Sequence, residues 1–428
     1  MRSASLWQGL LGVGKTTVVE RVEREEHLDG DGDVGVLIVV YARPAKGARR
    51  RCGRCGRRCP GFDTGRGRRR WRALDLGPVR AVIEADAPRV SCPAHGVVVA
   101  AVPWARHDAG HTRMFDDTVA WLATACAKSA VTELMRIAWR SVGSIVARVW
   151  ADGGGAADRL AGLRRIGIDE ISFQRGHKYL TIVVDHDSGR LLWAAEGRDA
   201  KTLDAFFDAL GEQRAAQLTH VTADAAEWIA SVVARRAPAA IRCADAFHIV
   251  AWATDALDVV RRQVWNSARG GKGRTTEESK ALKRARYSLW KNPENLTEKQ
   301  QAKLAWIAKS NPLLYRAYLL KEGLRAVFAI DGADGIEALG RWIGWARRCR
   351  IPAFVELAKK ITRQREAIIA ALTSGLSNAR IESTNTRIRL IIRRGFGFHH
   401  ADAIIALAML QLAGHRPVLP GRPQPTHT

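Results

Sequence analysis

Three short apolar runs in the middle of the chain are separated by turn residues. Residues 166–173 and 178–185 are rich in β-branched side chains and flank Gly176, and a third run occupies residues 190–195. β-branched residues favour extended strands, and glycine favours tight turns. The pattern therefore predicts an antiparallel meander of three strands. Asp169 lies within the first run, where an acid has to be paired or bind a metal because a buried, unpaired charge is costly.

Helical and extended patterns alternate after the meander. Residues 199–210 have the apolar spacing of an amphipathic helix, and residues 218–224 and 240–244 have the pattern of short strands. Asp224 and Asp245 stand at the carboxyl ends of these strands, where functional side chains of open α/β sheets gather. Acids on the first and fourth strands of such an order are the plan of an RNase H-like domain. Neighbouring carboxylates repel each other unless they share divalent cations, which two-metal phosphoryl transfer exploits.

A helical pattern precedes this α/β segment. Between residues 114 and 150 we expect short helices, with Ser129 or Ala130 at the start of one and Ser141 as a cap of the next. The layout resembles a helix-turn-helix, and a plain helical hairpin fits it equally well. In a helix-turn-helix, the side chains presented to DNA would be those of Arg140, Ser144 and Arg148.

The charge balance points to a polyanionic partner. Lys and Arg total 68 against 43 Asp and Glu, which gives a formal charge of +25 over 428 residues, and nucleic acid is the polyanion that such chains most often bind. No apolar run approaches the roughly 18 to 20 residues of a spanning helix, and no apolar signal segment follows Met1. We therefore expect no membrane association and a cytoplasmic location.

Cysteine spacing predicts a structural zinc site. Cys52 and Cys55 are separated by two residues, as are Cys92 and His95, and each such pair can present both ligands to one tetrahedral ion. Cys59 could replace one member of the first pair. Buried free thiols are the alternative, although the arginine-rich surroundings do not resemble a core.

The segment between the two ligand pairs is long and basic. Its 36 residues exceed the usual spacing and would hold a β-hairpin, with residues 79–85 as one strand. The arginine cluster at residues 66–70 would then form a rim that contacts DNA phosphates.

Residues 9–16 match the phosphate-binding P-loop pattern, but their surroundings do not. A P-loop follows a buried strand and opens a helix, whereas the preceding residues include Arg2 and two serines, and residues 17–23 alternate like a strand. Residues 34–41 form a second apolar run beyond a turn rich in Gly and Asp. We therefore interpret residues 1–44 as a β-hairpin region rather than a nucleotide-binding site.

Several separate motifs together resemble one known family. They are Cys52, Cys55, Cys92, Gly167, Ile168, Asp169, Glu170, Asp224 and the segments 245–248 and 376–385. With these residues the chain resembles the ISL3 family of bacterial insertion-sequence transposases over residues 45–415. The resemblance implies a DDE catalytic triad formed by Asp169, Asp224 and Glu382, which would bind Mg2+ or Mn2+. The chain departs from the family at His95, where many relatives have Cys, and at Ser383, where Gly is common.

The sequence around Glu382 is consistent with such a role. Ser377 or Asn378 can cap a helix there, which would place Glu382 near its start. A solvated glutamate favoured by the helix dipole is the alternative for this residue without the resemblance. The donors that share its helix face or follow it are candidates for contacts with DNA: Asn385, Thr386, Arg389, Arg393 and Arg394.

Other acids compete for the catalytic roles. Glu170, Asp185 and Asp245 are the nearest competitors. Without a metal, Asp169 would form an ion pair with an arginine, and Asp224 would be a turn or cap residue.

The long separation between the second and third acids predicts an insertion. Glu382 follows Asp224 by 382 − 224 = 158 residues, too many for one RNase H crossover, and the intervening pattern is helical and basic. The tryptophans of this region have apolar neighbours at helical spacing, so we expect them in a core rather than as platforms for base stacking. They are Trp265, Trp290, Trp306, Trp342 and Trp345.

The expected fold class is α/β, with an RNase H-like catalytic domain interrupted by an all-α insertion and preceded by a zinc-binding module and a helix-turn-helix-like region. The expected parts are a hairpin region (1–44), a zinc-binding module (45–112), a helix-turn-helix-like region (113–153), a catalytic core in two parts (160–256 and 376–415), an all-α insertion (257–375) and a disordered tail (416–428).

We expect the chain to be a DNA transposase. It would bind the terminal inverted repeats of an insertion sequence and catalyse metal-dependent strand cleavage and strand transfer. Its partners would be double-stranded DNA, at both the repeats and the target, and further copies of itself on DNA at the bacterial nucleoid. The alternative is a non-enzymatic regulator that binds DNA through the zinc module and the helix-turn-helix and keeps an inactive RNase H-like scaffold.

Overall fold

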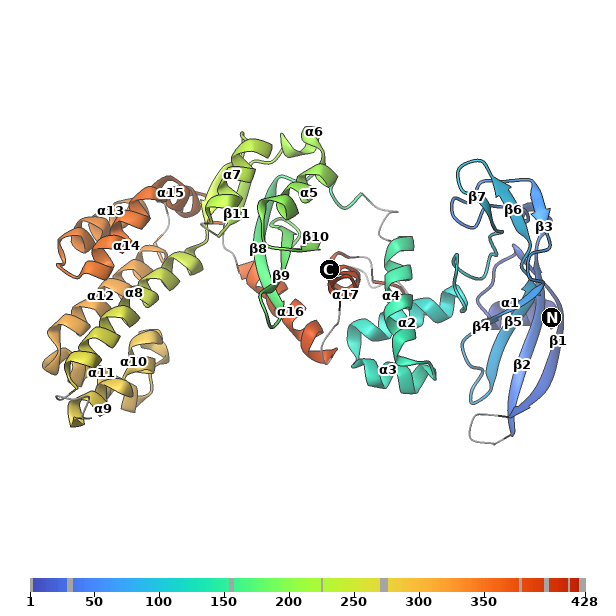
Figure 1. The fold of residues 1–428 in the computed structure, drawn as a ribbon, viewed down its shortest axis with the longest axis horizontal. Coiled ribbons are helices and arrows are strands. Elements are labelled where there is room, and N and C mark those ends of the chain that lie inside the picture. Colours follow the sequence, from blue (N-terminus) through green and yellow to red (C-terminus); the bar gives the residue numbers. More distant parts are fainter. Residues whose placement is uncertain are drawn as a thin grey trace. The chain divides into compact units, whose positions relative to one another are not determined.

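The computed structural model contains two compact units (Figure 1). The residues that it describes are 3–28, 34–153, 158–224, 226–269, 276–330, 332–376, 379–395, 400–414 and 416–422. The first unit comprises Met1–Arg159 and Ile388–Thr428, and the second comprises Leu160–Arg387. Helix α16, Ala379–Arg394, contributes residues to both units.

The amino-terminal hairpin belongs to a larger sheet than we predicted. Its strands pair antiparallel, as expected, and two strands from the segment between the zinc ligand pairs complete the sheet, in the order β1-β2-β5-β4. The strands are β1 (Thr17–Leu28), β2 (Val34–Pro44), β4 (Arg68–Arg72) and β5 (Arg80–Asp86). Val39 and Val40 of β2 pair with Val82 and Ile83 of β5, and most of these side chains are fully buried. The predicted boundary at residue 44 therefore cuts through one sheet.

The P-loop motif does not have the geometry that phosphate binding requires. Helix α1, Ser3–Leu10, precedes its second and third glycines, and β1 begins at Thr17, directly after its last residue. A P-loop has the opposite order, with a strand before the loop and a helix after it. The structure thus supports the interpretation of this segment as a non-nucleotide-binding region.

A small sheet and a helical group complete the first unit. The sheet has the order β3-β6-β7, and α17 packs against α2 and α4. Ser141 lies inside α4 instead of capping it, because that helix begins two residues earlier. The elements are β3 (Gly61–Asp63), β6 (Arg89–Cys92), β7 (Gly96–Val99), α2 (Arg113–Ala125), α3 (Lys128–Met135), α4 (Trp139–Gly153) and α17 (Ala401–Leu412), with a short 3-10 helix, η1, at Lys46–Ala48.

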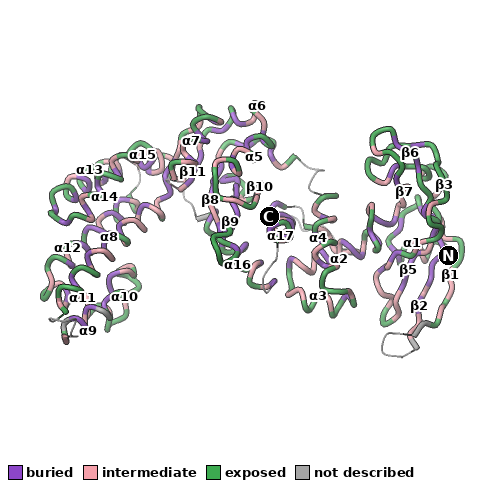
Figure 2. The backbone as a smooth tube through the Cα atoms, in the orientation of Figure 1, coloured by how far each residue is buried: buried purple, intermediate pink, exposed green. Residues whose placement is uncertain are grey.

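The second unit is built on a five-stranded sheet with the order β10-β9-β8-β11-β12. Strands β8, β9 and β10 form the predicted antiparallel meander, and β8, β11 and β12 are parallel. The central strands are buried along most of their length (Figure 2). The elements are β8 (Arg165–Gln174), β9 (Lys178–Asp185), β10 (Leu191–Glu196), α5 (Ala200–Leu210), α6 (Glu212–Ala215), β11 (His220–Ala223), α7 (Glu227–Arg236) and β12 (Ile241–Ala244).

The described residues between β12 and α16 form helices without strands. They pack around one apolar core that includes Trp342, which is 3% exposed, whereas Trp345 is 38% exposed. The elements are α8 (Ala246–Ser267), α9 (Glu277–Lys283), α10 (Arg286–Trp290), η3 (Pro293–Asn295), α11 (Glu298–Ser310), α12 (Pro312–Val327), α13 (Gly332–Arg348), α14 (Pro352–Arg363) and α15 (Arg365–Ser374). Within the described part of the chain, no helix has both the length and the apolarity needed to cross a bilayer.

Candidate functional site

The four predicted zinc ligands lie together. Cys52, Cys55, Cys92 and His95 each offer a ligand atom, and these atoms all lie within 4.8 Å of one another. The Cys55 and Cys92 sulfur atoms are 3.8 Å apart, and His95 Nδ1 lies 3.7 Å from Cys52 Sγ and 3.6 Å from Cys92 Sγ. A tetrahedron with Zn–S bonds of roughly 2.3 Å has edges of about 3.8 Å. The donor set and its spacing therefore fit a structural zinc ion.

Cys59, the alternative ligand, bonds to another group. The Cys59 thiol donates to the carbonyl of Arg57 over 3.3 Å, and Cys59 is not in the group of four.

Gly53, between the first two ligands, has no space for a side chain, because a Cβ there would lie 2.6 Å from the Val99 carbonyl oxygen. Burial opposes ionisation of Cys92, but backbone amides and the neighbouring Cys52 and Cys55 lower its pKa to about 7. A low pKa favours the thiolate form that binds metal.

Two of the three predicted catalytic acids lie on neighbouring parallel strands. Ile168 of β8 pairs with Ala223 of β11, so Asp169 and Asp224 follow in adjacent positions. Burial raises the pKa of Asp169, and hydrogen bonds from the Glu170 amide and from Asn385 act in the opposite direction. The sheet therefore places the two acids at adjacent positions, where the parallel pairing of β8 with β11 ends, as the sequence predicted.

A histidine balances this negative charge. His248 Nδ1 lies 2.6 Å from Asp245 Oδ2, and its Nε2 lies 4.0 Å from Asp224 Oδ2. The hydrogen bond to Asp245 raises the pKa of His248 to about 9, against its partial burial, and Asp224 and Asp169 add to the effect. The carboxylates of Asp169, Asp224 and Asp245 thus gather around His248, and divalent cations could neutralise such a cluster.

Helix α16 contacts the same edge of the sheet through Asn385. The Asn385 amide nitrogen donates to Asp169 Oδ2 over 2.5 Å, and its buried Oδ1 atom has no hydrogen-bond partner among the residues that the structure describes. Glu382 lies three residues earlier, so its side chain shares the same helix face. Glu382 is exposed and lies in the first turn of α16, while the predicted caps Ser377 and Asn378 lie outside the described residues. Among the described residues, the three acids do not form a group with all ligand atoms within 4.8 Å of one another.

A close contact fixes the start of α16 on the sheet. A Cβ atom at Gly167 would lie 2.1 Å from Ile381 Cδ1 and 3.0 Å from Thr222 Oγ1. Arg380 donates to the carbonyl oxygens of His186 and Asp187. These contacts hold Arg380 and Ile381, the two residues directly before Glu382, against the sheet.

We expect Gly167→Ala to displace α16 and to destabilise the protein by about 1–3 kcal/mol, the usual cost of overpacking a core. Cleavage of DNA should fall in parallel because Glu382 moves with the helix. The variant Gly167→Ala/Ile381→Ala should recover part of the stability, measured by thermal denaturation. Equal melting temperatures for Gly167→Ala and wild type would contradict the proposed contact.

The competing acids have other partners. Glu170 forms an ion pair with Arg198. Asp185 accepts from the backbone amides of Asp187 and Ser188, and Asp245 caps α8 by accepting from the Phe247 amide over 2.9 Å. These are structural roles, although Asp245 also holds the histidine described above.

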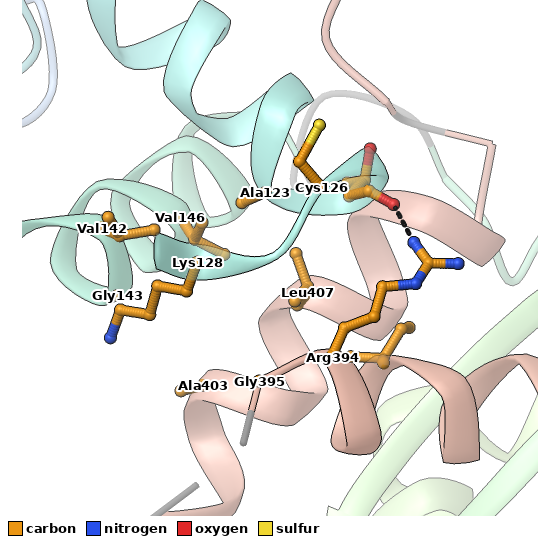
Figure 3. Close-up of a pocket in the computed structure, with 12 residues that line it drawn as sticks. Ala123, Cys126, Lys128, Val142, Gly143, Val146, Arg394, Gly395, Ala403 and Leu407 are labelled. Atoms are coloured by element: carbon orange, nitrogen blue, oxygen red, sulfur yellow. Dashed lines mark hydrogen bonds between the residues drawn. The ribbon is translucent and has the colours of Figure 1, made fainter. Parts of the chain in front are cut away.

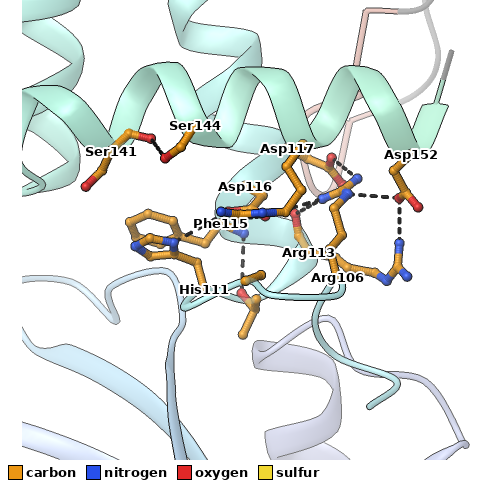
Figure 4. A network of polar contacts seen from close by, with 12 residues as sticks. Arg106, His111, Arg113, Phe115, Asp116, Asp117, Ser141, Ser144 and Asp152 are labelled. Atoms are coloured by element: carbon orange, nitrogen blue, oxygen red, sulfur yellow. Dashed lines mark hydrogen bonds and ion pairs between the residues drawn. The ribbon is translucent and has the colours of Figure 1, made fainter. Parts of the chain in front are cut away.

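The predicted DNA-contacting residues of α4 differ in their surroundings. Arg140 and Ser144 are exposed. Arg148 instead donates to Asp116 Oδ2 over 3.1 Å, and Asp116 is fully buried. Asp116 belongs to an ion-pair network with Arg106, which also contacts Asp117 and Asp152 (Figure 4). The Arg148 guanidinium is therefore paired with a buried acid of the protein itself.

The predicted donors of α16 also divide into two groups. Arg389 and Arg393 are exposed, whereas Asn385 is buried against Asp169. Arg394 donates to the backbone carbonyls of Thr124 and Ala125 over 3.2 and 3.3 Å (Figure 3).

The arginine cluster predicted to form a phosphate-contacting rim is also partly paired. Arg68 and Arg70 both bond to Glu84, over 2.8 and 2.7 Å. Sequence spacing could not show this, because Glu84 lies on the neighbouring strand.

Known protein families match three segments of the chain. A family model described as transposase matches residues 166–408, one described as the helix-turn-helix domain of transposase family ISL3 matches residues 100–150, and one described as the zinc-finger of transposase IS204/IS1001/IS1096/IS1165 matches residues 48–95. The transposase for insertion sequence element IS1557 of Mycobacterium tuberculosis is 62% identical over 99% of this chain and 98% of its own length. The transposase for insertion sequence element IS1001 of Bordetella parapertussis is 26% identical over 94% of this chain and 95% of its own length.

Proposed function

The chain belongs to the ISL3 family of transposases, and from this premise we propose that Asp169, Asp224 and Glu382 bind two divalent cations for the cleavage and transfer of DNA strands. One observation carries the proposal. Asp169 and Asp224 follow paired residues of neighbouring strands, and Asn385 bonds Asp169 to the helix that bears Glu382. This contact supports a site in which Glu382, one helical turn before Asn385, joins the two acids of the sheet.

We propose that this sheet is an RNase H-like core and that the helices α8–α15 are an insertion in it. The strand order β10-β9-β8-β11-β12, with an antiparallel meander followed by parallel strands, supports the assignment. Of the strands in this sheet, the first along the chain carries Asp169, and Asp224 directly follows the fourth, at the adjacent position.

The residues of the site would act mainly by positioning. When bound, Mg2+ or Mn2+ would neutralise charge on the scissile phosphate and activate the attacking water or 3′-hydroxyl. Asp169 would offer one carboxylate oxygen to the cation, while the Asn385 amide donates a hydrogen bond to the other carboxylate oxygen. No side chain would serve as a nucleophile, so the rate enhancement would come from orientation and charge.

The first unit would recognise the ends of the element. Its zinc module and its helices α2–α4 match family models for a zinc finger and for a helix-turn-helix domain. We propose that they bind the terminal inverted repeats, with Arg140 and Ser144 of α4 facing DNA, and that copies of the chain associate on it. Arg389 and Arg393 would contact DNA nearer to the acids.

The arginines of α4 provide a test of this assignment. Arg140→Ala should weaken DNA binding and lower the slope of log affinity against log salt by about 1, as expected for one lost phosphate contact, without changing stability. Arg148→Ala should instead destabilise the fold by roughly 3–5 kcal/mol, because it leaves buried Asp116 with a weaker partner. Filter binding at several salt concentrations and thermal denaturation measure both effects, and the reverse pattern would contradict the assignment.

A cleavage assay separates the transposase from the alternative, a DNA-binding regulator with an inactive scaffold. A duplex that carries the element's own repeat and flanking sequence should be cut at the repeat end only when Mg2+ or Mn2+ is added. Binding of the same duplex without any cleavage would support the regulator instead.

A further inference from the structure

Helix α8 packs against α14 (Figure 1), and residues of both helices line a groove. Its volume is about 310 Å3, and its lining includes Trp252 of α8 and Lys360 and Arg363 of α14. The helix α8 begins at the acidic edge of the sheet, since Asp245 caps it. His248 and Trp252 are four residues apart and therefore share one helix face. Helix α8 thus runs from Asp245 and His248, beside the acids of the sheet, to Trp252 in the lining of the groove.

Lys360 is held over this groove by an aromatic ring. Its ammonium nitrogen lies 3.3 Å from the centroid of the Trp252 ring, a close cation–π contact. The side chain is nevertheless exposed. Partial burial lowers the pKa of Lys360, and the carboxylates of Asp224 and Asp255 act in the opposite direction. A lysine of the helical region therefore lies within electrostatic reach of a catalytic acid.

Charged residues are distributed unevenly along the groove. Arg363 lies one turn beyond Lys360, is exposed, and makes no hydrogen bond or ion pair within the part of the chain that the structure describes. The next residue, Gln364, accepts from Arg242 of β12 over 2.5 Å, so this end of α14 lies beside the catalytic sheet. Glu356, towards the other end, pairs with Lys359. Two carboxylates, Asp255 and Glu356, also line the groove, and the cations Lys360 and Arg363 lie at the end of α14 that is beside the sheet.

A positive surface beside the acids would help DNA to approach, because the carboxylates of Asp169, Asp224 and Glu382 repel phosphates. Exposed cations that are not paired with a carboxylate are available to replace the counterions of a nucleic acid backbone. Lys360 and Arg363 are exposed, and within the described part of the chain neither forms an ion pair with a carboxylate.

We propose that the α8–α14 groove binds the sugar–phosphate backbone of the DNA strand next to the phosphate that is cut, with Lys360 and Arg363 as its phosphate contacts. The inference rests on the proposed function and gives the helical insertion a role in holding the substrate. Trp252 would act as the positioning residue that directs Lys360 into the groove.

The test uses the full chain and a duplex that carries one end of its own element. The variant Lys360→Ala/Arg363→Ala should bind this duplex about tenfold or more weakly, because it loses two charged contacts with phosphates. Its salt slope should fall by about 2, one for each lost contact. Lys360→Arg should behave as wild type. Lys359→Ala is the matched control, since Lys359 is an exposed lysine of the same helix that pairs with Glu356.

Neutral methylphosphonates locate the contact. Placed in turn at the phosphates that flank the cut, one of them should weaken binding by wild type and have no further effect on the double variant, because the two changes remove the same interaction. If the double variant and Lys359→Ala give the same affinity and salt slope, the groove does not bind DNA. These binding measurements do not require cleavage. A wild-type protein that bound DNA but did not cut it would contradict the proposed function, and the measurements would still show whether the groove binds DNA.

Discussion

Glu382→Gln is expected to reduce strand cleavage by about 10³-fold or more while leaving DNA binding nearly unchanged. The substitution keeps the size of the side chain but replaces a charged metal ligand with a neutral amide. Loss of several kcal/mol of charge stabilisation in the transition state corresponds to a rate change of this order. Glu382 is exposed, so the fold should tolerate the change.

A glutamate at the equivalent position of the preceding helix provides the matched control for this result. Glu366 lies in the first turn of α15, as Glu382 does in α16, and it is also exposed. Glu366→Gln should cleave the repeat-ended duplex at the wild-type rate. Equal cleavage by wild type and Glu382→Gln would remove Glu382 from the catalytic triad.

Loss of the zinc site is expected to have the second large effect, on folding and DNA binding rather than on chemistry. The small β3-β6-β7 sheet has little core beyond the cysteines themselves, Val90 and Val98. Binding of structural zinc contributes on the order of 10 kcal/mol or more to the folding of such modules. Cys92→Ser should therefore abolish zinc binding, unfold this module and abolish specific binding to the repeats.

Zinc content, measured by atomic absorption, distinguishes the ligands from the other cysteines. Wild type and Cys59→Ser should retain one zinc ion per chain, because Cys59 lies outside the group of four ligands. Cys126→Ser should also retain it, since Cys126 is exposed and outside this group. If Cys59→Ser loses zinc as Cys92→Ser does, Cys59 is a ligand and our assignment is wrong.

Local sequence patterns predicted the elements that place the catalytic acids. The β-branched runs gave the meander β8-β9-β10, and the acids Asp224 and Asp245 follow β11 and β12 as expected. Ligand spacing predicted the zinc group as well, because two residues between ligands already dictate a local turn. These predictions succeed because the relevant signal lies within a few residues.

Features that depend on distant contacts were missed. The pairing of β2 with β5 joins segments that no local pattern connects, so the hairpin appeared to stand alone. Asn385 and Arg148 were predicted to contact DNA, and the structure pairs them with Asp169 and Asp116. The signal that could have indicated internal partners is the apolar spacing around each residue, which places both near the buried sides of their helices.

The position of His248 shows a related limit. The sequence placed it after β12 beside Asp245, but only the fold brings it to Asp224 across the parallel strands. The groove between α8 and α14 is also invisible in the sequence, because Trp252 and Lys360 are more than one hundred residues apart.

The most direct test of the three-acid site is anomalous diffraction at the manganese absorption edge, on crystals of the protein bound to a repeat-ended DNA with Mn2+. We expect two manganese ions about 3.5–4 Å apart, the usual separation in two-metal sites. Asp169 and Asp224 should coordinate them, with Glu382 completing the site. Manganese absent from these acids, or a Glu382 carboxylate that stays remote from the ions when DNA is bound, would contradict the account.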